Sequence, residues 1–554
     1  MTANPITGQQ PQETILGLLA RSRDVRLQAI GRAARPDFED WLSHVRPAAA
    51  CTRPIRLAGT MDRIEAETGR LLARTNTRDL PDGVIYKACG NRRATVCPAC
   101  SERYKRDAYQ LVRTGLVGGK GVPEDVARHP AVFPTLTAPS FGEVHTRHVK
   151  RHTCGNRRRC DCRPEPCHAR RELAFCPHAR RLVCFARHEE TDRVLGTPLC
   201  LDCYDHDAQA VWNAFAGVLW SRTTNTVRKF LRRRAAERGI PFPIAVTRTG
   251  NFREVDPFRL SFGKVAEMQR RGVVHFHAIV RLDGVDPDDP AAIVPPPPGL
   301  SAADLVDAVT HAAAVTGVRT PPHPDRPEGW PVRWGEQLLV KVITAAADGE
   351  VTDAMVAAYL AKYATKATEV TGHTSGRLNT ATIDLYADPE GDHTARLLDA
   401  CWRLGRPAAG TRQPWTCPGC DRPTLLLACP TCHLERPGGA EDEADEGEAP
   451  NPYTRLRRWA HMLGFGGHFL TKSRRYSVTF SMLRQQRVVF RRTETSGPPT
   501  EGPDETPTVL VVNFLAFVGA GWHTTADAML ANTSAALARE HHEAALQDLA
   551  ALAA

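Results

Sequence analysis

The sequence predicts an α+β fold in which an antiparallel sheet is flanked by helices, with zinc-binding inserts and helical N- and C-terminal regions. Three observations support this prediction. Two alternating apolar segments flank the turn sequence "RRG" at 270–272, two other stretches carry apolar residues at helical spacing, and the 17 cysteines include several CxxC pairs. A chain of 554 residues is too long for one hydrophobic core, so we expect several folded units.

Composition and motifs divide the chain into six regions. They are a helical N-terminal region (1–85), a Cys-containing zinc knuckle region (86–125), a central sheet-forming domain (126–400) with a Cys/His-rich insert at 150–206, a CxxC/CxxC zinc ribbon (401–436), an acidic linker (437–452) and a basic, helical C-terminal region (453–554).

Local patterns predict the main elements of these regions. In chain order they are an extended segment at 131–142, a long helix at about 207–238, a hairpin formed by "FRLSFGKVAEMQ" and "GVVHFHAIVRL", a proline-rich loop at 287–299, a strand at 336–344, a helix at 352–369 opened by Thr352 or Asp353, and an alanine-rich helix at the end of the chain.

Charge and cysteine content narrow the class of protein. The net charge is +10, and arginine-rich blocks at 222–234 and 472–477 favour a polyanionic partner such as nucleic acid. No secretory signal opens the sequence, and the apolar run 509–522 is too short to span a bilayer, so we expect a cytoplasmic protein without a membrane partner. In a reducing compartment, CxxC pairs indicate thiolate-bound zinc rather than disulfides.

The hairpin places two histidines on one face. Alternate strand residues share a face, so His275 and His277 stand side by side while Phe276 packs behind them. With the turn centred near Arg271, Glu267 faces His275 directly and has His277 as its diagonal neighbour. Two imidazoles and a carboxylate suit a divalent cation with open positions for a substrate. The alternative is that both histidines are hydrogen-bonded residues of a half-buried strand.

A histidine-triad nucleotide hydrolase also contains a His-apolar-His sequence. That class requires a third histidine two residues further on, where this chain has Ile279. The sequence therefore disfavours that class.

The helix at 352–369 carries a second group of polar residues. Tyr359, Lys362, Tyr363 and Lys366 follow the spacing i, i+3, i+4 and i+7 and therefore share one helix face. A phenol attacks phosphorus efficiently when neighbouring cations favour its phenolate form. The four residues are therefore candidate catalytic groups for covalent phosphoryl transfer, and the alternative is a solvated face with aromatic packing.

Three motifs resemble those of a known family. "TLTAPSFG" at 135–142, "HFHAIV" at 275–280 and "YLAKYATK" at 359–366 occur in the order of the motifs of HUH endonucleases that initiate rolling-circle replication. Stretches such as "CGNRRATVCPACS" and "PLCLDCYDHDAQAVWNAFAG" resemble the RepSA-type initiators of actinomycete plasmids, and this likeness extends over roughly residues 85–540.

The resemblance implies an HUH endonuclease domain at 126–400. Its expected parts are a five-stranded antiparallel sheet, a magnesium or manganese ion held by His275, His277 and Glu267, and Tyr363 as the nucleophile followed by Lys366. Some relatives carry a glutamate one turn before the nucleophile to activate water. This chain has Tyr359 there, so a second tyrosine could accept the DNA strand instead.

The resemblance also implies the partners. Tyr363 would nick origin DNA at a single-stranded site, form a 5′-phosphotyrosine and release a 3′ hydroxyl that primes a host polymerase. The protein would also contact the double-stranded origin. The sequence contains no GxxxxGK[ST] phosphate loop, so unwinding would depend on a host helicase.

The cysteines predict structural zinc. Cys417, Cys420, Cys429 and Cys432 form two CxxC pairs that can close a tetrahedron around one ion. Earlier in the chain, a first set lacks a fourth ligand, for which Cys51 or a residue of the insert is an option. This first set is Cys89, Cys97 and Cys100. A second set is built on the CxxC pair Cys200 and Cys203, and the candidates to complete it are Cys176, Cys184, His178 and His188. A further group could hold another ion: Cys154, Cys160, Cys162, Cys167 and His168. We expect two zinc ions before residue 210.

Two other functions fit part of this pattern. The first is a zinc-dependent DNA-binding regulator in which the histidines and tyrosines are structural. The second is a relaxase or transposase with the same chemistry, although relaxases commonly carry their tyrosine near the N-terminus, unlike Tyr363.

Overall fold

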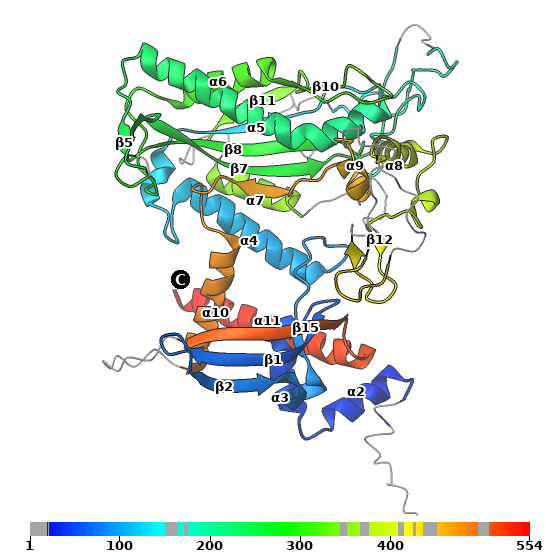
Figure 1. Cartoon of the computed structure of the whole chain (residues 1–554), viewed down its shortest axis with the longest axis vertical. Helices are drawn as coiled ribbons and strands as arrows, with labels where there is room; N and C mark the ends of the chain where they lie inside the picture. The colour runs from blue at the N-terminus through cyan, green and yellow to red at the C-terminus, as the bar shows by residue number, and fades with distance from the viewer. Residues whose placement is uncertain are drawn as a thin grey trace, which may run out of the picture. The chain divides into compact units, whose positions relative to one another are not determined.

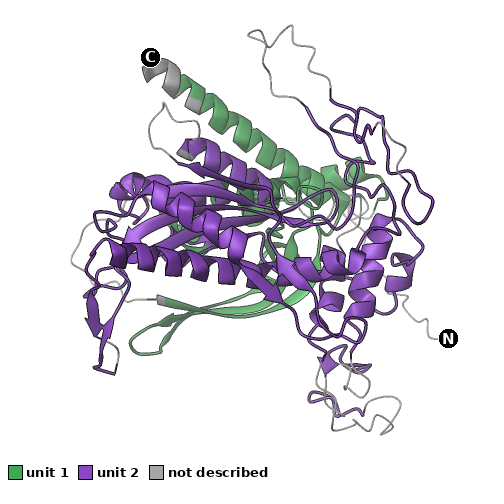
Figure 2. Ribbon diagram, turned by 90° about the horizontal axis from the view of Figure 1, so that it is seen from above, with its two compact units in different colours: residues 1–107, 481–554 green, residues 108–480 purple. Residues whose placement is uncertain are grey.

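The structure is a computed structural model. It describes residues 19, 22–149, 164–170, 175–246, 249–343, 352–365, 376–407, 415–424, 428–435, 451–496 and 509–553. The chain forms two compact units, of which unit 1 comprises residues 1–107 and 481–554 and unit 2 comprises residues 108–480 (Figure 2).

Unit 1 combines an N-terminal and a C-terminal segment of the chain around an antiparallel sheet. Its elements are α2 (Val25–Ala33), α3 (Phe38–Val45), η1 (Arg46–Ala48), β1 (Ile55–Glu65), β2 (Leu71–Asn76), η2 (Thr77–Asp79), η3 (Pro81–Gly83), β3 (Ile85–Lys87), β15 (Val509–Ala520) and α11 (Thr525–Ala553). The sheet order is β15-β1-β2, and β3 also pairs with β1.

This sheet corrects two predictions. Residues 1–85 are not helical throughout, because β1, β2 and the start of β3 lie within them, and the C-terminal region 453–554 contains the long strand β15. β15 pairs with β1 along its whole length, from Ile55 opposite Ala520 to Glu65 opposite Val509. The two backbones approach so closely at Gly59 that a Cβ there would lie 2.0 Å from the Phe514 carbonyl oxygen.

Two helices cross the boundaries between the units. α4 (Pro98–Val117) contains the boundary after residue 107, and α10 (Phe480–Ser496) begins at the boundary after residue 480.

Unit 2 contains most of the remaining elements. In chain order they are η4 (Glu124–Arg128), β4 (Ala131–Leu136), α5 (His206–Glu237), β5 (Ile244–Val246), β6 (Phe252–Glu254), β7 (Phe258–Met268), β8 (Val274–Gly284), α6 (Ala302–Val315), β9 (Gly317–Arg319), β10 (Pro331–Arg333), β11 (Leu338–Val342), α7 (Asp353–Tyr363), η7 (Ile383–Leu385), α8 (His393–Leu404), β12 (Trp415–Thr416), β13 (Pro423–Thr424), α9 (Arg455–Arg458), η8 (Ala460–Met462) and β14 (Leu470–Lys472).

The centre of unit 2 is a five-stranded antiparallel sheet with the order β11-β4-β8-β7-β14 (Figure 1). The predicted hairpin is confirmed as β7 and β8, and Glu267 faces His275 in the expected register. The predicted strand at 336–344 is confirmed as β11, and the predicted long helix is confirmed as α5. The fifth strand, β14, has only three residues and lies in the region that we predicted to be a separate C-terminal part.

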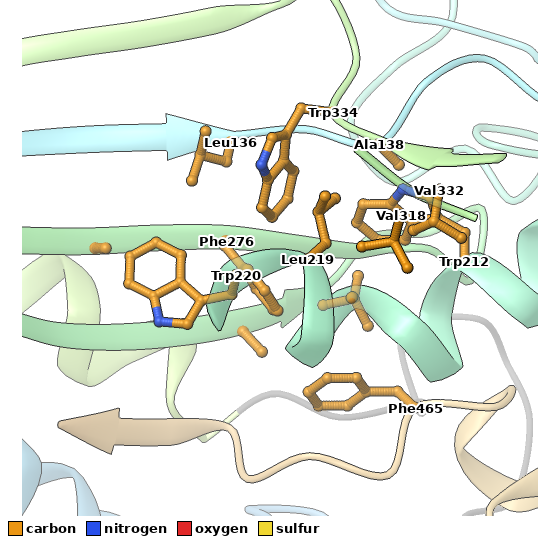
Figure 3. Packing of buried hydrophobic residues seen from close by; sticks show 14 of the residues in the cluster. Leu136, Ala138, Trp212, Leu219, Trp220, Phe276, Val318, Val332, Trp334 and Phe465 are labelled. Carbon is orange, nitrogen blue, oxygen red and sulfur yellow. The ribbon is translucent and has the colours of Figure 1, made fainter. Parts of the chain in front are cut away.

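One face of the sheet is covered by α5, whose first turn is capped by the Asp205 side chain. The even-numbered residues of β8 point to this helix, and Phe276 packs edge-on against Trp220 and Trp334 (Figure 3). These side chains are almost fully buried, and burying a large apolar side chain contributes about 1.5–3 kcal/mol. The core therefore holds the strands in register and turns the histidines toward the opposite face.

Charged side chains are also buried in the sheet. Arg281 and Asp283 on β8 are both inaccessible to solvent and form two hydrogen bonds, from Nε to Oδ1 (2.7 Å) and from Nη2 to Oδ2 (2.9 Å). Asp283 also accepts hydrogen bonds from His129 Nδ1 (2.8 Å) and Ser261 Oγ (2.5 Å). A buried ion pair is tolerated when hydrogen bonds satisfy both charges in this way.

Lys264 on β7 is also buried, and the described residues give it no such partner set. Its Nζ lies 3.9 Å from the ring centre of Phe276 and 5.3 Å from that of Trp220. Burial lowers the pKa of the Lys264 ammonium to about 7, because the charged form loses its hydration.

Within the described part of the chain, no helix combines the length and the apolar character that a bilayer crossing requires.

Candidate active site and metal centres

The β7–β8 hairpin brings the two histidines and the glutamate together. His277 Nε2 donates to Glu267 Oε2 over 3.0 Å, and the rings of His275 and His277 have their centres 4.5 Å apart. Both histidines are buried, with exposed fractions of 8% for His275 and 3% for His277. The hairpin thus produces the juxtaposition of side chains that its register predicts.

Each histidine has a polar contact through its Nδ1 atom. The Thr135 hydroxyl lies 3.1 Å from His277 Nδ1, because β4 pairs with β8 at these two residues. The Gln269 amide donates to His275 Nδ1 over 3.3 Å. Thr135 opens the "TLTAPSFG" motif and Gln269 ends the first strand sequence of the hairpin, but neither residue was predicted to belong to the site.

The tyrosine helix lies on this side of the sheet. α7 begins after the Thr352 cap, as predicted, and packs on β7. The ring centres of Tyr359 and Tyr363 lie 5.0 Å and 5.5 Å from that of His277, and 4.5 Å from each other. Phe133 on β4 completes the aromatic group, with its ring parallel to that of His277.

Of the two lysines predicted on the tyrosine helix, the structure describes one. Lys362 is exposed, and its Nζ lies 5.9 Å from the ring centre of Tyr363. Lys366 lies outside the described residues.

The surroundings set the protonation of two groups at this site. Burial, together with the neighbouring His277, lowers the pKa of His275 to about 4, so its ring is neutral near neutral pH. Burial and a hydrogen bond with Tyr363 raise the pKa of the Tyr359 phenol, and the negative charge of Glu267 adds to this effect. These effects disfavour the phenolate form of Tyr359.

The donor set fits a divalent cation in its chemistry. Neutral imidazoles and a carboxylate are ligands for ions such as magnesium and manganese, and three protein ligands leave positions for phosphate oxygen and water. Within the trio, His277 Nε2 and Glu267 Oε2 lie 3.0 Å apart. The trio is not among the described groups whose ligand atoms all lie within 4.8 Å of one another.

Four other groups do meet that distance and could hold a metal ion such as zinc. They are Cys51, Cys89, Cys97 and Cys100; His145, Cys167, Cys184 and His188; Cys176, His178, Cys200 and Cys203; and Cys417, Cys420, Cys429 and Cys432. All the described cysteines are free of disulfide bonds.

The structure identifies the missing ligand candidate of two sets that the sequence left incomplete. Cys51 is the fourth member of the group with Cys89, Cys97 and Cys100, and His178 completes the group of Cys176, Cys200 and Cys203.

The remaining group before residue 210 differs from the prediction. We expected two ions in this part of the chain, and the described residues form three groups there. Cys167 lies with His145, Cys184 and His188, whereas the sequence suggested a group with His168 and with three cysteines, Cys154, Cys160 and Cys162, that lie outside the described residues. His145 was missed because it has no CxxC neighbour, although it stands in the histidine-rich stretch "EVHTRHVKRH".

The predicted zinc ribbon has the geometry of thiolate ligands. Cys417 Sγ lies 3.1 Å from Cys432 Sγ, and Cys420 Sγ lies 3.4 Å from Cys429 Sγ. Backbone amides donate hydrogen bonds to the Cys429 sulfur and lower the pKa of this thiol to about 6, and the amide of Cys432 has the largest effect. A thiol that ionises readily is suited to metal binding.

Comparisons with known proteins agree with this arrangement. A family model described as "Replication initiator protein, pSAM2" (RepSA) matches residues 37–536. A curated replication initiator protein from Streptomyces ambofaciens is 35% identical over 511 residues, which cover 91% of each chain. No solved structure matches the chain. With most of its length matched by both comparisons, the chain belongs to the RepSA family of replication initiator proteins.

Proposed function

We propose that this protein initiates rolling-circle replication of a plasmid by nicking and rejoining origin DNA through a covalent 5′-phosphotyrosine, as an HUH endonuclease. The observation that supports this most strongly is the position of Tyr363 and Tyr359, whose rings lie within 5.5 Å of the His277 ring, centre to centre. A phenol beside an imidazole and a carboxylate is the set of groups needed to cut and capture a DNA strand.

Tyr363 is the proposed nucleophile. Its oxygen forms a bond to the phosphorus of the scissile phosphodiester while the bond from phosphorus to the 3′ oxygen breaks. The electron pair of that bond leaves with the 3′ oxygen, which takes up a proton, and the phenol proton passes to solvent. One phosphate ester replaces another, so the step needs no nucleotide cofactor and can be reversed by a 3′ hydroxyl.

His275, His277 and Glu267 are the proposed ligands of a magnesium or manganese ion. When bound, such an ion withdraws charge from a non-bridging phosphate oxygen. The chain supports this role through Thr135, whose hydroxyl can donate to or accept from His277 Nδ1 and so adapts to either tautomer of the ring.

Tyr359 is the proposed second acceptor. It lies one helical turn before Tyr363, with the two ring centres 4.5 Å apart, and partial burial and the hydrogen bond with Tyr363 raise the pKa of its phenol. Tyr363, which the motif resemblance identifies as the nucleophile, makes the first cleavage. Tyr359 then receives the strand in a later transfer, when Tyr363 is already esterified.

The partners follow from this chemistry. The protein binds the double-stranded origin and a single-stranded nick region, a host polymerase extends the released 3′ hydroxyl, and a host helicase unwinds the duplex. The four cysteine-containing groups hold structural zinc.

A nicking assay on a supercoiled plasmid carrying its own origin, with manganese present, tests the proposal. Tyr363→Phe should bind the origin normally but neither relax the plasmid nor leave a covalent adduct. Tyr359→Phe should make the first cut and fail in the second transfer. Tyr386→Phe, a half-exposed tyrosine outside the site, serves as the matched control and should behave as the wild type.

Mass spectrometry of the adduct separates this function from its alternatives. A tryptic peptide carrying the DNA end should contain Tyr363. If the wild-type protein binds the origin yet never forms an adduct, the protein is a DNA-binding regulator. If it forms an adduct and transfers the strand without supporting replication of the plasmid, it acts as a relaxase or transposase.

A further inference from the structure

One of the four cysteine-containing groups joins the insert to the residue His145 just before it and has a mixed donor set. Two histidines and two cysteines converge there, His145, Cys167, Cys184 and His188. His145 Nδ1 lies 3.2 Å from His188 Nε2, and Cys184 Sγ lies 3.5 Å from the same His188 nitrogen. Cys167 Sγ lies 3.8 Å from His145 Nδ1. Four donors of this kind, two sulfur and two nitrogen, match a closed tetrahedral zinc site.

The group also has the outer contacts that such sites use. His188 Nδ1 donates to Asp192 Oδ2 over 2.6 Å, which fixes the ring and directs Nε2 to the other donors. The Thr146 backbone amide donates to Cys167 Sγ over 3.2 Å, a contact that stabilises a thiolate. A carboxylate behind a ligating histidine is a recurring second layer of zinc sites.

The segment that carries Asp192 also reaches the turn of the β7–β8 hairpin. Arg270, in that turn, donates through Nη1 to the Asp192 carbonyl (2.7 Å) and also donates to the Glu190 carbonyl. Gly196 lies so close to the turn that a Cβ there would be 2.8 Å from the Arg271 nitrogen. The insert and the hairpin turn are therefore in direct contact on both sides of Asp192.

Backbone hydrogen bonds connect this contact to another donor of the group. The His145 amide donates to the Thr197 carbonyl, and the Gly196 amide donates to the His145 carbonyl, each over 2.9 Å. The Leu199 amide donates to the Glu143 carbonyl over the same distance. Two of the four donors thus connect to the segment that touches the turn. His188 does so through Asp192, and His145 does so through its backbone.

The opposite side of the turn is held by the core of unit 2. Gln209 and His393 both hydrogen-bond the Arg271 carbonyl, over 2.8 Å and 2.9 Å, and Asn213 donates to the Gly272 carbonyl over 2.9 Å. The turn is thus held between helices α5 and α8 on one side and the insert on the other.

We infer that His145, Cys167, Cys184 and His188 bind a zinc ion that fastens the insert to the turn of the β7–β8 hairpin. The ion fixes His188, His188 fixes Asp192, and the Asp192 segment holds Arg270. Zinc therefore rigidifies the hairpin near Glu267 and His275 without being part of that site. The inference does not depend on the proposed nicking activity.

Zinc content tests the binding site. Cys167→Ser and His188→Ala should each bind one zinc ion fewer per chain than the wild type, measured by elemental analysis after dialysis. Asp192→Asn should keep the ion but bind it about 10–100-fold more weakly. Cys401→Ala removes a buried cysteine outside the four groups, and His311→Ala removes an exposed histidine, so both controls should keep the wild-type content.

Cobalt substitution of the wild-type protein gives evidence that does not depend on the folding of a variant. The difference spectrum between the wild type and Cys167→Ser should be that of a tetrahedral site with two sulfur and two nitrogen ligands. His168→Ala is a demanding control, because His168 Nδ1 lies 3.0 Å from Cys167 Sγ. Loss of the ion in His168→Ala but not in His145→Ala would overturn the ligand assignment.

Hydrogen exchange tests the connection to the hairpin. Amides in peptides spanning 266–276 should exchange faster in Cys167→Ser than in the wild type. Arg270→Ala should show the same faster exchange while it keeps the full zinc content, and Arg319→Ala, an exposed arginine on β9, should change neither. Unchanged zinc content in Cys167→Ser would overturn the site. A lost ion with unchanged exchange at the turn would overturn the fastening role.

Discussion

Glu267 Oε2 lies 3.0 Å from His277 Nε2, across the two strands of one hairpin. The glutamate side chain is 16% exposed and the histidine side chain 4%, so the pair sits at the edge of the core with one side toward solvent. Two strands that are adjacent in sequence supply it, so the arrangement forms as soon as the hairpin does. This property makes the pair a suitable point for testing metal dependence.

Replacing Glu267 by glutamine should weaken metal use. The amide keeps the shape of the carboxylate but loses its charge, so the manganese concentration that gives half-maximal nicking should rise at least about tenfold. Titration of manganese in the nicking assay measures this. Glu254→Gln changes an exposed glutamate on β6 and should leave the curve unchanged. An unaltered manganese requirement in Glu267→Gln would remove Glu267 from the ligand set.

Thr135 should support His277 through its hydroxyl. Thr135→Val keeps the shape of the side chain but removes the hydrogen bond to Nδ1, and losing such a partner costs about 10–100-fold in metal affinity. Thr135→Ser should restore most of the affinity. Calorimetric titration with manganese gives the comparison, and equal affinities for the valine and serine variants would show that the hydroxyl has no role.

The stability of the protein should depend on Lys264 above neutral pH. The pKa of this lysine is about 7 in the folded chain, against an ordinary value of 10.5, so between these limits the unfolded state binds more protons. The free energy of unfolding should therefore rise with pH in this window, by up to about 1.4 kcal/mol per pH unit.

Lys264→Met should remove that dependence. The variant should be more stable than the wild type at about pH 7, and the difference should shrink toward about pH 10. Urea denaturation at several pH values measures both curves, and Lys229→Met, on the exposed side of α5, provides the control. Parallel curves for the wild type and Lys264→Met would mean that Lys264 is solvated.

Asp283→Asn should destabilise the central sheet strongly. It leaves the Arg281 guanidinium buried beside an uncharged partner, and breaking a buried ion pair in this way costs about 3–5 kcal/mol. Asp288→Asn, at an exposed position of the following loop, should cost far less. Urea denaturation checks both. The double variant Arg281→Met/Asp283→Leu should lose less stability than Asp283→Asn, because no unpaired charge remains.

Acid should weaken the same network. Although burial opposes ionisation, the hydrogen bonds from His129 and Arg281 hold the pKa of Asp283 below its usual range. The contribution of this carboxylate is therefore complete above the pKa of the unfolded chain and is lost as the pH falls through the lower folded value. Asp283→Asn should flatten the acid limb of the stability curve, and an unchanged limb would contradict this assignment.

Local patterns were sufficient to predict the hairpin and the tyrosine helix. Strand alternation and a short turn fix the register that sets Glu267 opposite His275, and the helical spacing places Tyr359 and Tyr363 on one face. Both depend on residues close in sequence. The contact of Tyr359 with His277 depends on tertiary packing, and the motif resemblance suggested it while periodicity did not.

Features that join distant residues were not predicted. The pairing of β1 with β15 leaves no signature in either strand, because many partners could satisfy the same hydrogen bonds. β14 has too few residues for its alternation to be recognised. The zinc groups pose a similar problem. A CxxC pair defines only half of a site, so Cys51 could be offered as one option and not assigned, and the group with His145 contains no CxxC pair at all.

The pairing of β1 with β15 also has a consequence for biosynthesis. Translation delivers β1 near the beginning and β15 only after the whole of unit 2 has been made. Until the ribosome has made β15, the edge of β1 that pairs with it has no strand partner. By then all five strands of the unit 2 sheet have been synthesised. A nascent chain that stalls before residue 509 would thus expose an open strand edge, a natural target for chaperones and proteases.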